Sequence, residues 1–423
     1  MTRLRPHIVI VVIVLASWLD APPAWPQGAG GFEPDPVFQA SQLVQPQLLK
    51  GENFTLDPKV PVRGYMEVFT IHSAFGDIPV AGRDLLPVRV GEIPAIAELS
   101  NTSKSGAFLK AAGQATAKPV MAAANMVTHP VDTAKGMPAA VGRFFDRVEL
   151  GAKKIADSGE GPPPKEGVDF AAEAGKRVGM SVINVLGYEQ ERRKLAKQLS
   201  VDPYTTNPIL AAKLDDVAWV AFSGRFAVNT TMSVLMPFSM AVSATSIAND
   251  MVWDTPPADL INLNGKKLLA MGASETQVRM LLRNQFYSLT VLTAFVTALE
   301  QLGGVSGRNT VISFAAGASS ETQARLISGA TQLLVRYHKG AEPLKQVTGS
   351  GPIVARTGSG ALLIAAPVDY VTWNQRLSTF RNRADLKAPT RIAWITGRFS
   401  PRAAKEMQAA GWKLREGQDP GGK

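Results

Sequence analysis

A long helix is predicted from Ser274-Glu-Thr-Gln-Val-Arg-Met-Leu-Leu-Arg-Asn-Gln-Phe286, whose apolar pattern continues to Leu302. Serine is favoured at the position before a helix, and leucines that recur at helical spacing form one buried face. Ser320-Glu-Thr-Gln323 repeats this beginning and precedes a further helical pattern. The two copies indicate either a weak helical repeat or separate uses of one favourable cap, and separate use is the simpler interpretation.

Residues 168–347 as a whole are predicted to form a helical domain around these two helices. Asp202-Pro203 and Asn207-Pro208 each place a capping side chain before a proline, which fits the first position of a helix. Gly187–Leu199 is rich in charges of both signs, which predicts a helix that faces solvent. The Gly- and Pro-rich residues 157–167 precede this domain and are predicted to be a linker.

Strands are predicted on both sides of the helical domain. Residues 29–156 are expected to be an extended lead-in that contains a strand at Tyr65–Ile71 and amphipathic helices punctuated by prolines. Within this lead-in, Pro87 and Pro94 are expected to limit any helix to short pieces, because proline lacks the N–H that a helix needs.

Residues 348–418 are predicted to form a small α+β module. We expect a β-hairpin at Pro352–Ala366, a strand at Arg391–Thr396, a helix from Ser400 to Ala410, and a last strand at Trp412–Glu416. The predicted fold class is therefore mainly α, with a small C-terminal α+β module and a short N-terminal strand region.

The N-terminus has the order of features that is typical of a secretion signal. Arg3 and Arg5 are followed by twelve uncharged residues at Ile8–Leu19, and then by small or helix-breaking residues. An uncleaved membrane anchor is the alternative, but twelve helical residues span only about 18 Å of a hydrocarbon core of about 30 Å. Residues 1–28 are thus predicted to be a signal peptide, cleaved between Ala21 and Ala29, which predicts a periplasmic or secreted protein.

Composition narrows the chemistry and the partners. The chain has no cysteine, which excludes disulfides, thiolate catalysis, cysteine-ligated metals and lipoprotein-type lipidation. Its formal charge is +10, and it is +9 without the predicted signal peptide, so anionic partners are favoured. Basic residues are dispersed and aromatic residues are only 7 %, which argues against a nucleic-acid surface. The predicted partner is an envelope protein, or an anionic polymer or lipid surface of the envelope, without a cofactor.

One candidate anion site is predicted at the beginning of the last helix. Unpaired backbone N–H groups at a helix N-terminus attract anions, and arginine adds forked donors. The candidate residues are Thr396, Gly397, Arg398, Ser400 and Arg402. Ordinary helix capping by Ser400, with Pro401 at the first helical position, is the simpler interpretation.

Two further features suggest contact with a membrane. Amphipathic pieces between residues 118 and 154 could lie on a lipid surface or wrap across another domain, and wrapping is favoured. The surface candidates here are Arg143, Phe144, Phe145, Arg147, Lys153 and Lys154. Helices predicted at residues 226–249 and 284–304 could insert into a bilayer, because residues 226–249 and 284–299 carry no charge. The first stretch, however, contains many Ser, Thr and Asn residues, and the second is short. A buried position in a helical core is therefore favoured for both.

Catalytic patterns are not found. His72, His129 and His338 lack metal-ligand spacing, and neither a nucleophile elbow nor a phosphate-binding glycine loop is present. The acidic pairs Glu189/Glu191 and Asp215/Asp216 are candidates for general acid–base chemistry, although neighbouring residues of a helix point in different directions. No catalytic residue and no metal ligand is predicted, and solvated faces and caps explain these acids more simply.

Five short phrases of the chain carry a resemblance to other sequences: Asp202-Pro-Tyr-Thr-Thr-Asn-Pro208, His129-Pro-Val-Asp-Thr-Ala-Lys-Gly136, Gly142-Arg-Phe-Phe145, Ser400-Pro-Arg-Ala403 and Ala410-Gly-Trp412. They resemble phrases of exported proteobacterial proteins that have no assigned activity, over most of residues 65–416. The resemblance implies export and brings no catalytic residues with it.

These observations lead to three hypotheses about function. The first is an exported, non-enzymatic envelope protein that binds a partner or an anionic surface. The second is a secreted hydrolase whose site is assembled from dispersed acidic and serine residues. The third is a membrane-active protein that uses the helices predicted at residues 226–249 and 284–304.

Overall fold

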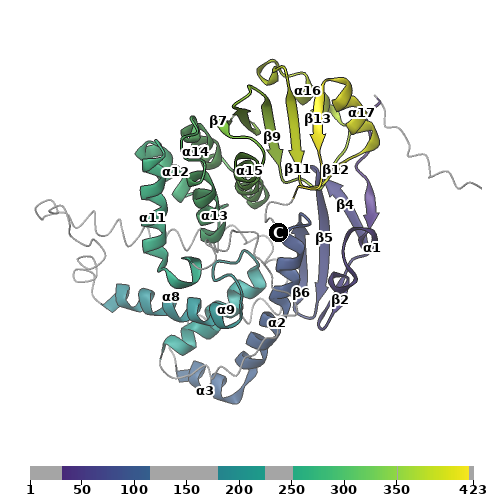
Figure 1. Ribbon diagram of the computed structural model, residues 1–423. Coiled ribbons are helices and arrows are strands. Elements are labelled where there is room, and N and C mark those ends of the chain that lie inside the picture. Colours follow the sequence, from purple (N-terminus) through teal and green to yellow (C-terminus); the bar gives the residue numbers. More distant parts are fainter. Residues whose placement is uncertain (1–30, 115–179, 224–250, 350, 419–423) are drawn as a thin grey trace, which may run out of the picture.

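The computed structural model describes residues 31–114, 180–223, 251–349 and 351–418. In these residues an N-terminal antiparallel sheet, a helical part and a C-terminal mixed sheet pack together (Figure 1). The predicted linker at residues 157–167 and the predicted helix at residues 226–249 lie outside the described residues.

The N-terminal sheet is built from short antiparallel strands. Its order is β1-β4-β5-β3-β2, and β6 pairs with β5. The strands are β1 (Val37–Gln39), β2 (Lys50–Gly51), β3 (Phe54–Leu56), β4 (Lys59–Arg63), β5 (Met66–Ser73) and β6 (Gly76–Ala81), with α1 (Ala40–Leu43) and η1 (Pro46–Leu48) between them.

The helical part follows this sheet in the chain. Its helices are α2 (Leu85–Lys104), α3 (Gly106–Gln114), α8 (Met180–Gln198), α9 (Pro208–Phe222), α11 (Pro257–Ala270), α12 (Glu275–Leu282), α13 (Leu289–Glu300), α14 (Arg308–Ala316) and α15 (Glu321–Gly340). Among the described residues, no helix is long and apolar enough to cross a membrane.

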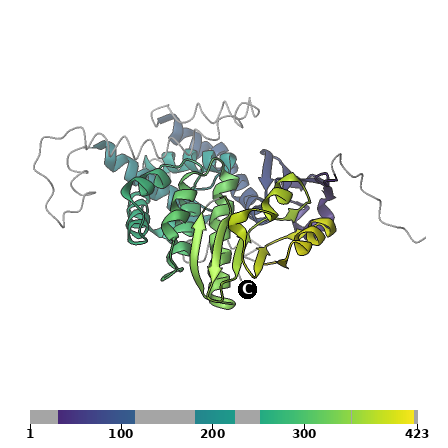
Figure 2. The ribbon, with the colours of Figure 1, turned by 90° about the horizontal axis from the view of Figure 1, so that it is seen from above.

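The C-terminal sheet has the order β13-β11-β9-β8-β7, in which β9, β11 and β13 are parallel. Alternate side chains of its strands pack against α15 on one face and against α16 and α17 on the other, so the strands lie between two helical layers (Figure 2). The elements are β7 (Leu344–Gly349), β8 (Ile353–Thr357), β9 (Leu362–Ala366), β10 (Tyr370–Val371), α16 (Gln375–Arg381), η3 (Ala384–Leu386), β11 (Arg391–Ile395), β12 (Arg398–Phe399), α17 (Pro401–Ala409) and β13 (Trp412–Arg415).

The predicted fold class, mainly α with a small C-terminal α+β module and a short N-terminal strand region, is wrong. The described residues contain thirteen strands in three sheets. The N-terminal strands are short and contain Gly and Pro, so their local pattern is weak. Pro61 lies inside β4, where a proline argues against a strand. It is tolerated because no hydrogen bond between strands needs an N–H at this position. On the side of β1, the Val62 N–H donates to the carbonyl of Pro36, and β4 pairs with β5 only from Val62 onward.

Two helix predictions were wrong for identifiable reasons. The helix predicted from Ser274 to Leu302 is two helices, α12 and α13, because the side chain of Asn284 accepts from the Phe286 N–H and Ser288 caps α13. Conversely, Leu85–Lys104 is one helix despite Pro87 and Pro94. Pro87 falls in the first turn, where N–H groups have no helical partner, and Pro94 lies on the exposed side of α2.

Local predictions in the C-terminal module were confirmed. β8 and β9 form the expected hairpin, β11 and β13 are the expected strands, and Ser400 caps α17. The caps at Ser274, Ser320 and Asn207 were also confirmed, and at Ser274 the structure adds a capping box with Gln277. Asp202-Pro203, however, does not begin a helix: its carboxylate accepts from the Tyr204 N–H and forms a turn.

Candidate functional site

The loop at residues 202–207, which we call the junction loop, joins α2 to other helices of the helical part around one buried carboxylate. Glu92 of α2 is 3 % exposed. Its oxygens accept hydrogen bonds from the Thr205 hydroxyl at 2.5 Å, the Asn207 amide at 2.8 Å and the Arg89 guanidinium at 2.9 Å. Asn207 also caps α9 through its Oδ1. Asn207 therefore both holds the junction loop to Glu92 and begins the next helix.

The same loop reaches α15 through Thr206. The Thr206 hydroxyl donates to Glu321 at 2.6 Å, and the Arg325 Nε donates to the same carboxylate oxygen at 2.8 Å. Arg89 donates to the Thr206 hydroxyl and lies 3.6 Å from Glu321. Burial works to raise the pKa of Glu321, but the charges of Arg325 and Arg89 hold that pKa below its ordinary value. We call Arg89, Glu92, Thr205, Thr206, Asn207, Glu321 and Arg325 the α2 network.

Asp202 attaches the start of the junction loop to α13. It accepts a hydrogen bond from the Thr290 hydroxyl at 2.6 Å. Burial raises the pKa of Asp202, while these hydrogen bonds to its ionised form act in the opposite direction. The phrase Asp202–Pro208, on which part of the resemblance rests, thus contacts α2, α13 and α15 and begins α9.

A second buried carboxylate joins the N-terminal sheet to the C-terminal module. Asp369, in the link between β9 and β10, accepts hydrogen bonds from the backbone N–H of Glu67 at 2.9 Å and of Arg83 at 3.2 Å. Glu67 is fully buried in β5, and its carboxylate accepts from the Arg83 Nε at 2.9 Å. We call Glu67, Arg83 and Asp369 the Asp369 junction.

The charges of the Asp369 junction do not balance, because two carboxylates share one guanidinium. Burial is the largest cause that raises the pKa of Asp369, to about 7, and the negative charges of Glu67 and Asp84 act in the same direction. The Glu67 N–H and Arg83 lower that pKa only in part. Asp369 is therefore a carboxyl that changes its charge near neutral pH.

The predicted anion site lies beside this junction, but internal groups use its donors. The Gly397 N–H donates to the Val368 carbonyl and the Arg398 N–H to the Asp369 carbonyl. Ser400 caps α17 and also donates its hydroxyl to Glu33 at 2.5 Å. The Arg398 guanidinium packs over the rings of Phe38 and Tyr370, and half-buried Arg402 lies beside Gly31. Thr396 donates to Val368. The segment is thus arranged as ordinary strand and cap structure.

The acidic pairs do not converge on one point. Glu189 is buried, whereas Glu191 lies 3.8 Å from Lys194. Asp215 accepts from the Tyr188 hydroxyl and pairs with Arg192, both at 2.6 Å. Burial raises the pKa of Asp216 to about 6. Because Glu189, Arg192 and Arg193 are buried, the prediction that this helix faces solvent was wrong for these side chains.

The histidines are engaged elsewhere. His72 lies on the surface between Asp77 at 2.9 Å and Asp57 at 3.5 Å, and the hydrogen bond to Asp77 raises its pKa. His338 accepts a hydrogen bond from the Leu344 N–H. His129 and the surface candidates Arg143, Phe144, Phe145, Arg147, Lys153 and Lys154 lie outside the described residues. In the ranges that the structure describes, no group of acidic or histidine side chains is arranged to hold a metal ion.

The uncharged stretch at residues 284–299, part of the helix predicted at residues 284–304, is a core helix where it is helical. Ten of the twelve residues of α13 are buried. They pack in the main hydrophobic core with α11, α14 and α15. The preference for a buried helix over a membrane-inserting one was therefore confirmed for this stretch.

Basic residues gather in the C-terminal module. Residues 375–418 contain ten Lys and Arg against three Asp and Glu, whereas residues 31–114 contain seven against nine. We call the layer of α16, residues 382–387 and α17 the basic layer. Within it, Arg381 pairs with Glu406 at 2.6 Å and Arg383 with Asp385 at 2.6 Å, and Arg376, Lys387 and Lys405 are exposed.

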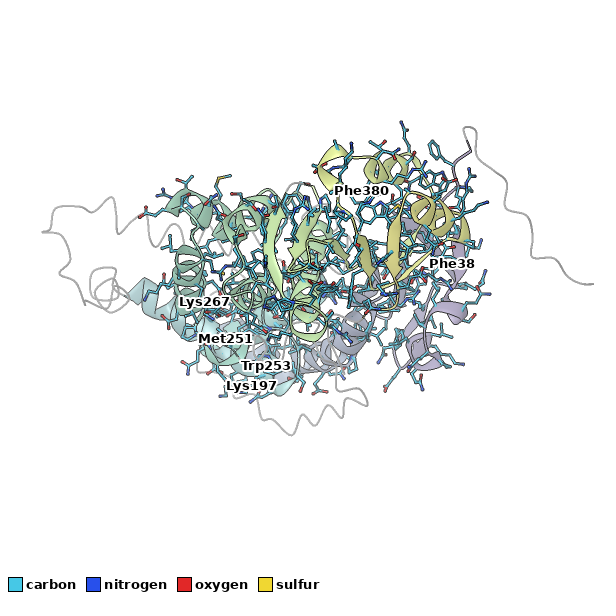
Figure 3. All side chains as sticks on the ribbon, turned by 45° about the horizontal axis from the view of Figure 1, so that its top comes forward. Phe38, Lys197, Met251, Trp253, Lys267 and Phe380 are labelled. Carbon is cyan, nitrogen blue, oxygen red and sulfur yellow. The ribbon has the colours of Figure 1, made fainter. Side chains whose placement is uncertain are left out.

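Aromatic rings support this module. Phe380 of α16 stacks on Trp412, and the Arg391 guanidinium lies over the ring of the same tryptophan at 5.2 Å. Figure 3 shows Phe38 and Phe380 at this end of the molecule, whereas Lys197 and Lys267 lie in the helical part. The basic layer is thus a rigidly packed surface on one side of the protein.

No family model, curated protein or solved structure matches this chain.

Sequence patterns did not single out the residues of the α2 network or of the Asp369 junction. Arg89 and Glu92 are three residues apart inside an apolar helix, and Glu321 and Arg325 are four apart. That spacing is a usable signal, because a charge pair on the apolar side of a helix must find partners when it is buried. Asp369 carries no local signal, since its partners are 302 and 286 residues away.

Proposed function

We propose that this chain is an exported, non-enzymatic protein of the bacterial envelope that associates with an anionic surface through its C-terminal module. The observation that carries the proposal is the excess of basic residues in residues 375–418, ten against three. Because residues 31–114 carry a slight excess of acid, the molecule is electrically asymmetric. A field of this kind orients a protein on an anionic surface and speeds its association.

The basic side chains in question are available at the surface. Arg376, Lys387 and Lys405 are exposed on the basic layer. Each exposed Lys or Arg that comes close to an anionic membrane contributes about 1 kcal/mol of attraction. Three such contacts contribute about 3 kcal/mol to the association. Attraction of this kind is reversible and needs no inserted helix, in keeping with α13 being a core helix.

A non-enzymatic role is supported by how the buried acids are used. Glu92 and Glu321 have arginine, threonine and asparagine partners that connect elements of the fold. Groups that hold elements together in this way are not free to move protons to and from a substrate. The predicted signal peptide at residues 1–28 supports the export part of the proposal.

Vesicle flotation tests this function. The chain is mixed with vesicles of phosphatidylcholine alone or with added phosphatidylglycerol, and we expect it to float only with the anionic lipid and to be released by 0.5 M salt, at which charges are screened within about 5 Å. Removing three charges of the basic layer (Arg376→Gln, Lys387→Gln, Lys405→Gln) is expected to weaken binding about a hundredfold.

The matched control removes three charges from the helical part (Lys194→Gln, Lys266→Gln, Arg279→Gln) and is expected to weaken binding much less. All three control side chains are exposed, as in the basic layer. Equal loss in the two triple variants, or equal flotation with neutral vesicles, would contradict the proposal.

A further inference from the structure

The Asp369 junction is one of the points at which the N-terminal residues and the C-terminal module exchange hydrogen bonds; Tyr65 also donates to Asn374, and Ser400 to Glu33. Besides the two bonds that the Asp369 carboxylate accepts, the backbone N–H groups of Asp369 and Tyr370 both donate to the carbonyl of Tyr65, at 3.0 Å each. On the other side, the Arg398 N–H donates to the Asp369 carbonyl at 3.0 Å. One residue therefore ties β5, the start of α2 and β12 together.

Every element around Asp369 contributes to its electrostatic environment. Glu67 comes from β5, and Arg83 and Asp84 come from the link between β6 and α2. Arg398 of β12 faces the backbone of Asp369, while its guanidinium lies over Phe38 and Tyr370. The Arg83 guanidinium is bound to the Glu67 carboxylate, so it is already neutralised when it meets Asp369. An ionised Asp369 thus lacks a counter-charge of its own.

We propose that the Asp369 junction is a pH-dependent joint, which holds the N-terminal sheet against the C-terminal module in acid and loosens as the pH rises toward neutral. A protonated carboxyl keeps a carbonyl oxygen that accepts the Glu67 and Arg83 N–H groups, and it places no second charge beside Glu67. An ionised carboxyl keeps the hydrogen bonds but must be held without water next to another carboxylate, which is costly.

The direction of the pH effect follows from the two states of the joint. In the closed joint, burial raises the pKa of Asp369 to about 7, and in an open, hydrated joint it returns to the ordinary value of 3.8. The closed state binds the proton more tightly, so its advantage is complete below about pH 4, is lost as the pH rises to about 7, and changes little above that. The opening constant is therefore expected to increase about fiftyfold between pH 5 and pH 7 and about twofold between pH 7 and pH 9.

Amide hydrogen exchange of the full chain tests this joint. Exchange of the Glu67 and Arg83 amides, corrected for the intrinsic effect of pH, reports the opening directly because both amides donate to Asp369. In the wild-type chain, the opening constant is expected to rise about fiftyfold between pH 5 and pH 7 and about twofold between pH 7 and pH 9. Asp369→Asn, which keeps an acceptor oxygen and removes the charge, is expected to change less than threefold over the same range.

Asp385→Asn is the matched control, because Asp385 lies in the same module with an exposed carboxylate paired to Arg383, and it is expected to follow the wild-type curve. Exchange in the wild type that does not change with pH, or a pH dependence that persists in Asp369→Asn, would overturn the proposal. If Asp369→Asn does not fold, Glu67→Gln is used instead. Removing this neighbouring negative charge is expected to lower the pH at which the opening constant stops rising. An unchanged pH dependence would count against the proposal.

Discussion

Glu92 is the single side chain on which the junction loop most depends. It is buried, and its three partners come from α2 and from both ends of the Thr205–Asn207 segment. Replacing a buried ion pair by apolar residues can be neutral, but removing one member leaves the other as an uncompensated charge. The α2 network therefore specifies how α2 docks against the junction loop and α15 more than it adds net stability.

We expect Glu92→Gln to lower the free energy of unfolding by about 2–3 kcal/mol, because buried Arg89 loses the nearer of its two carboxylates and keeps only Glu321, at 3.6 Å. Urea unfolding followed by circular dichroism measures the change. Glu98→Gln is the control, since Glu98 lies on the same helix and is half-buried, and it is expected to cost less than 1 kcal/mol. Equal losses in the two variants would show that Glu92 has no special role.

At the residue scale, the sequence predicted caps well and buried charges poorly. Ser274, Ser320, Asn207 and Ser400 cap helices as expected, because a cap depends on the few residues that follow it. The roles of Glu92 and Asp369 depend on partners more than a hundred residues away. Local patterns do not contain that information.

Among the elements, the short strands β10 and β12 bring the backbone of Gly397 against that of Asp369. A side chain at position 397 has no room, because a Cβ there would lie 1.9 Å from the Asp369 carbonyl oxygen. The segment Thr396–Arg402 contains its glycine for this close approach. From the sequence, that glycine belongs to a candidate anion site, while ordinary helix capping is the favoured interpretation of the segment.

Gly397→Ala is expected to destabilise the C-terminal module by about 1–3 kcal/mol or more, as overpacking usually does. The midpoint of thermal unfolding is expected to fall by several degrees, measured by calorimetry. Gly340→Ala is the control, because nothing lies within 4 Å of a Cβ at the end of α15 and alanine favours a helix. An unchanged midpoint in Gly397→Ala would refute the close packing of β10 on β12.

Elements were predicted where their own residues specify them and missed where tertiary contacts do. The hairpin of β8 and β9 and the α17–β13 pair follow from local alternation and from the glycines between them. The break between α12 and α13 depends on Asn284, whose amide also donates to the carbonyls of Ala316 and Ala318. Pro94 is accepted within α2 because the buried face of that helix outweighs one missing hydrogen bond.

In the whole molecule, the largest error of the sequence-based interpretation is the N-terminal sheet. Residues 29–156 were expected to be an extended lead-in, but β1 to β6 form a sheet whose core includes Phe69, Ile71 and Val80. Strands of two to eight residues are stable only when they pair, so their pattern is faint before the pairing is known. The charge of the chain, by contrast, could be predicted from the sequence, because the excess of Lys and Arg is a property of composition. The structure places much of that excess in the C-terminal module.

Lysine footprinting tests the central claim, that the basic layer is the surface that meets an anionic partner. The chain is acetylated briefly with and without phosphatidylglycerol vesicles, and mass spectrometry reports the modification of each lysine. We predict that the vesicles protect Lys387 and Lys405 of the basic layer at least fivefold, while Lys194 and Lys266 of the helical part are modified as before. All four lysines are exposed in the free chain. Protection that is absent, or that is equal at all four lysines, would contradict the account.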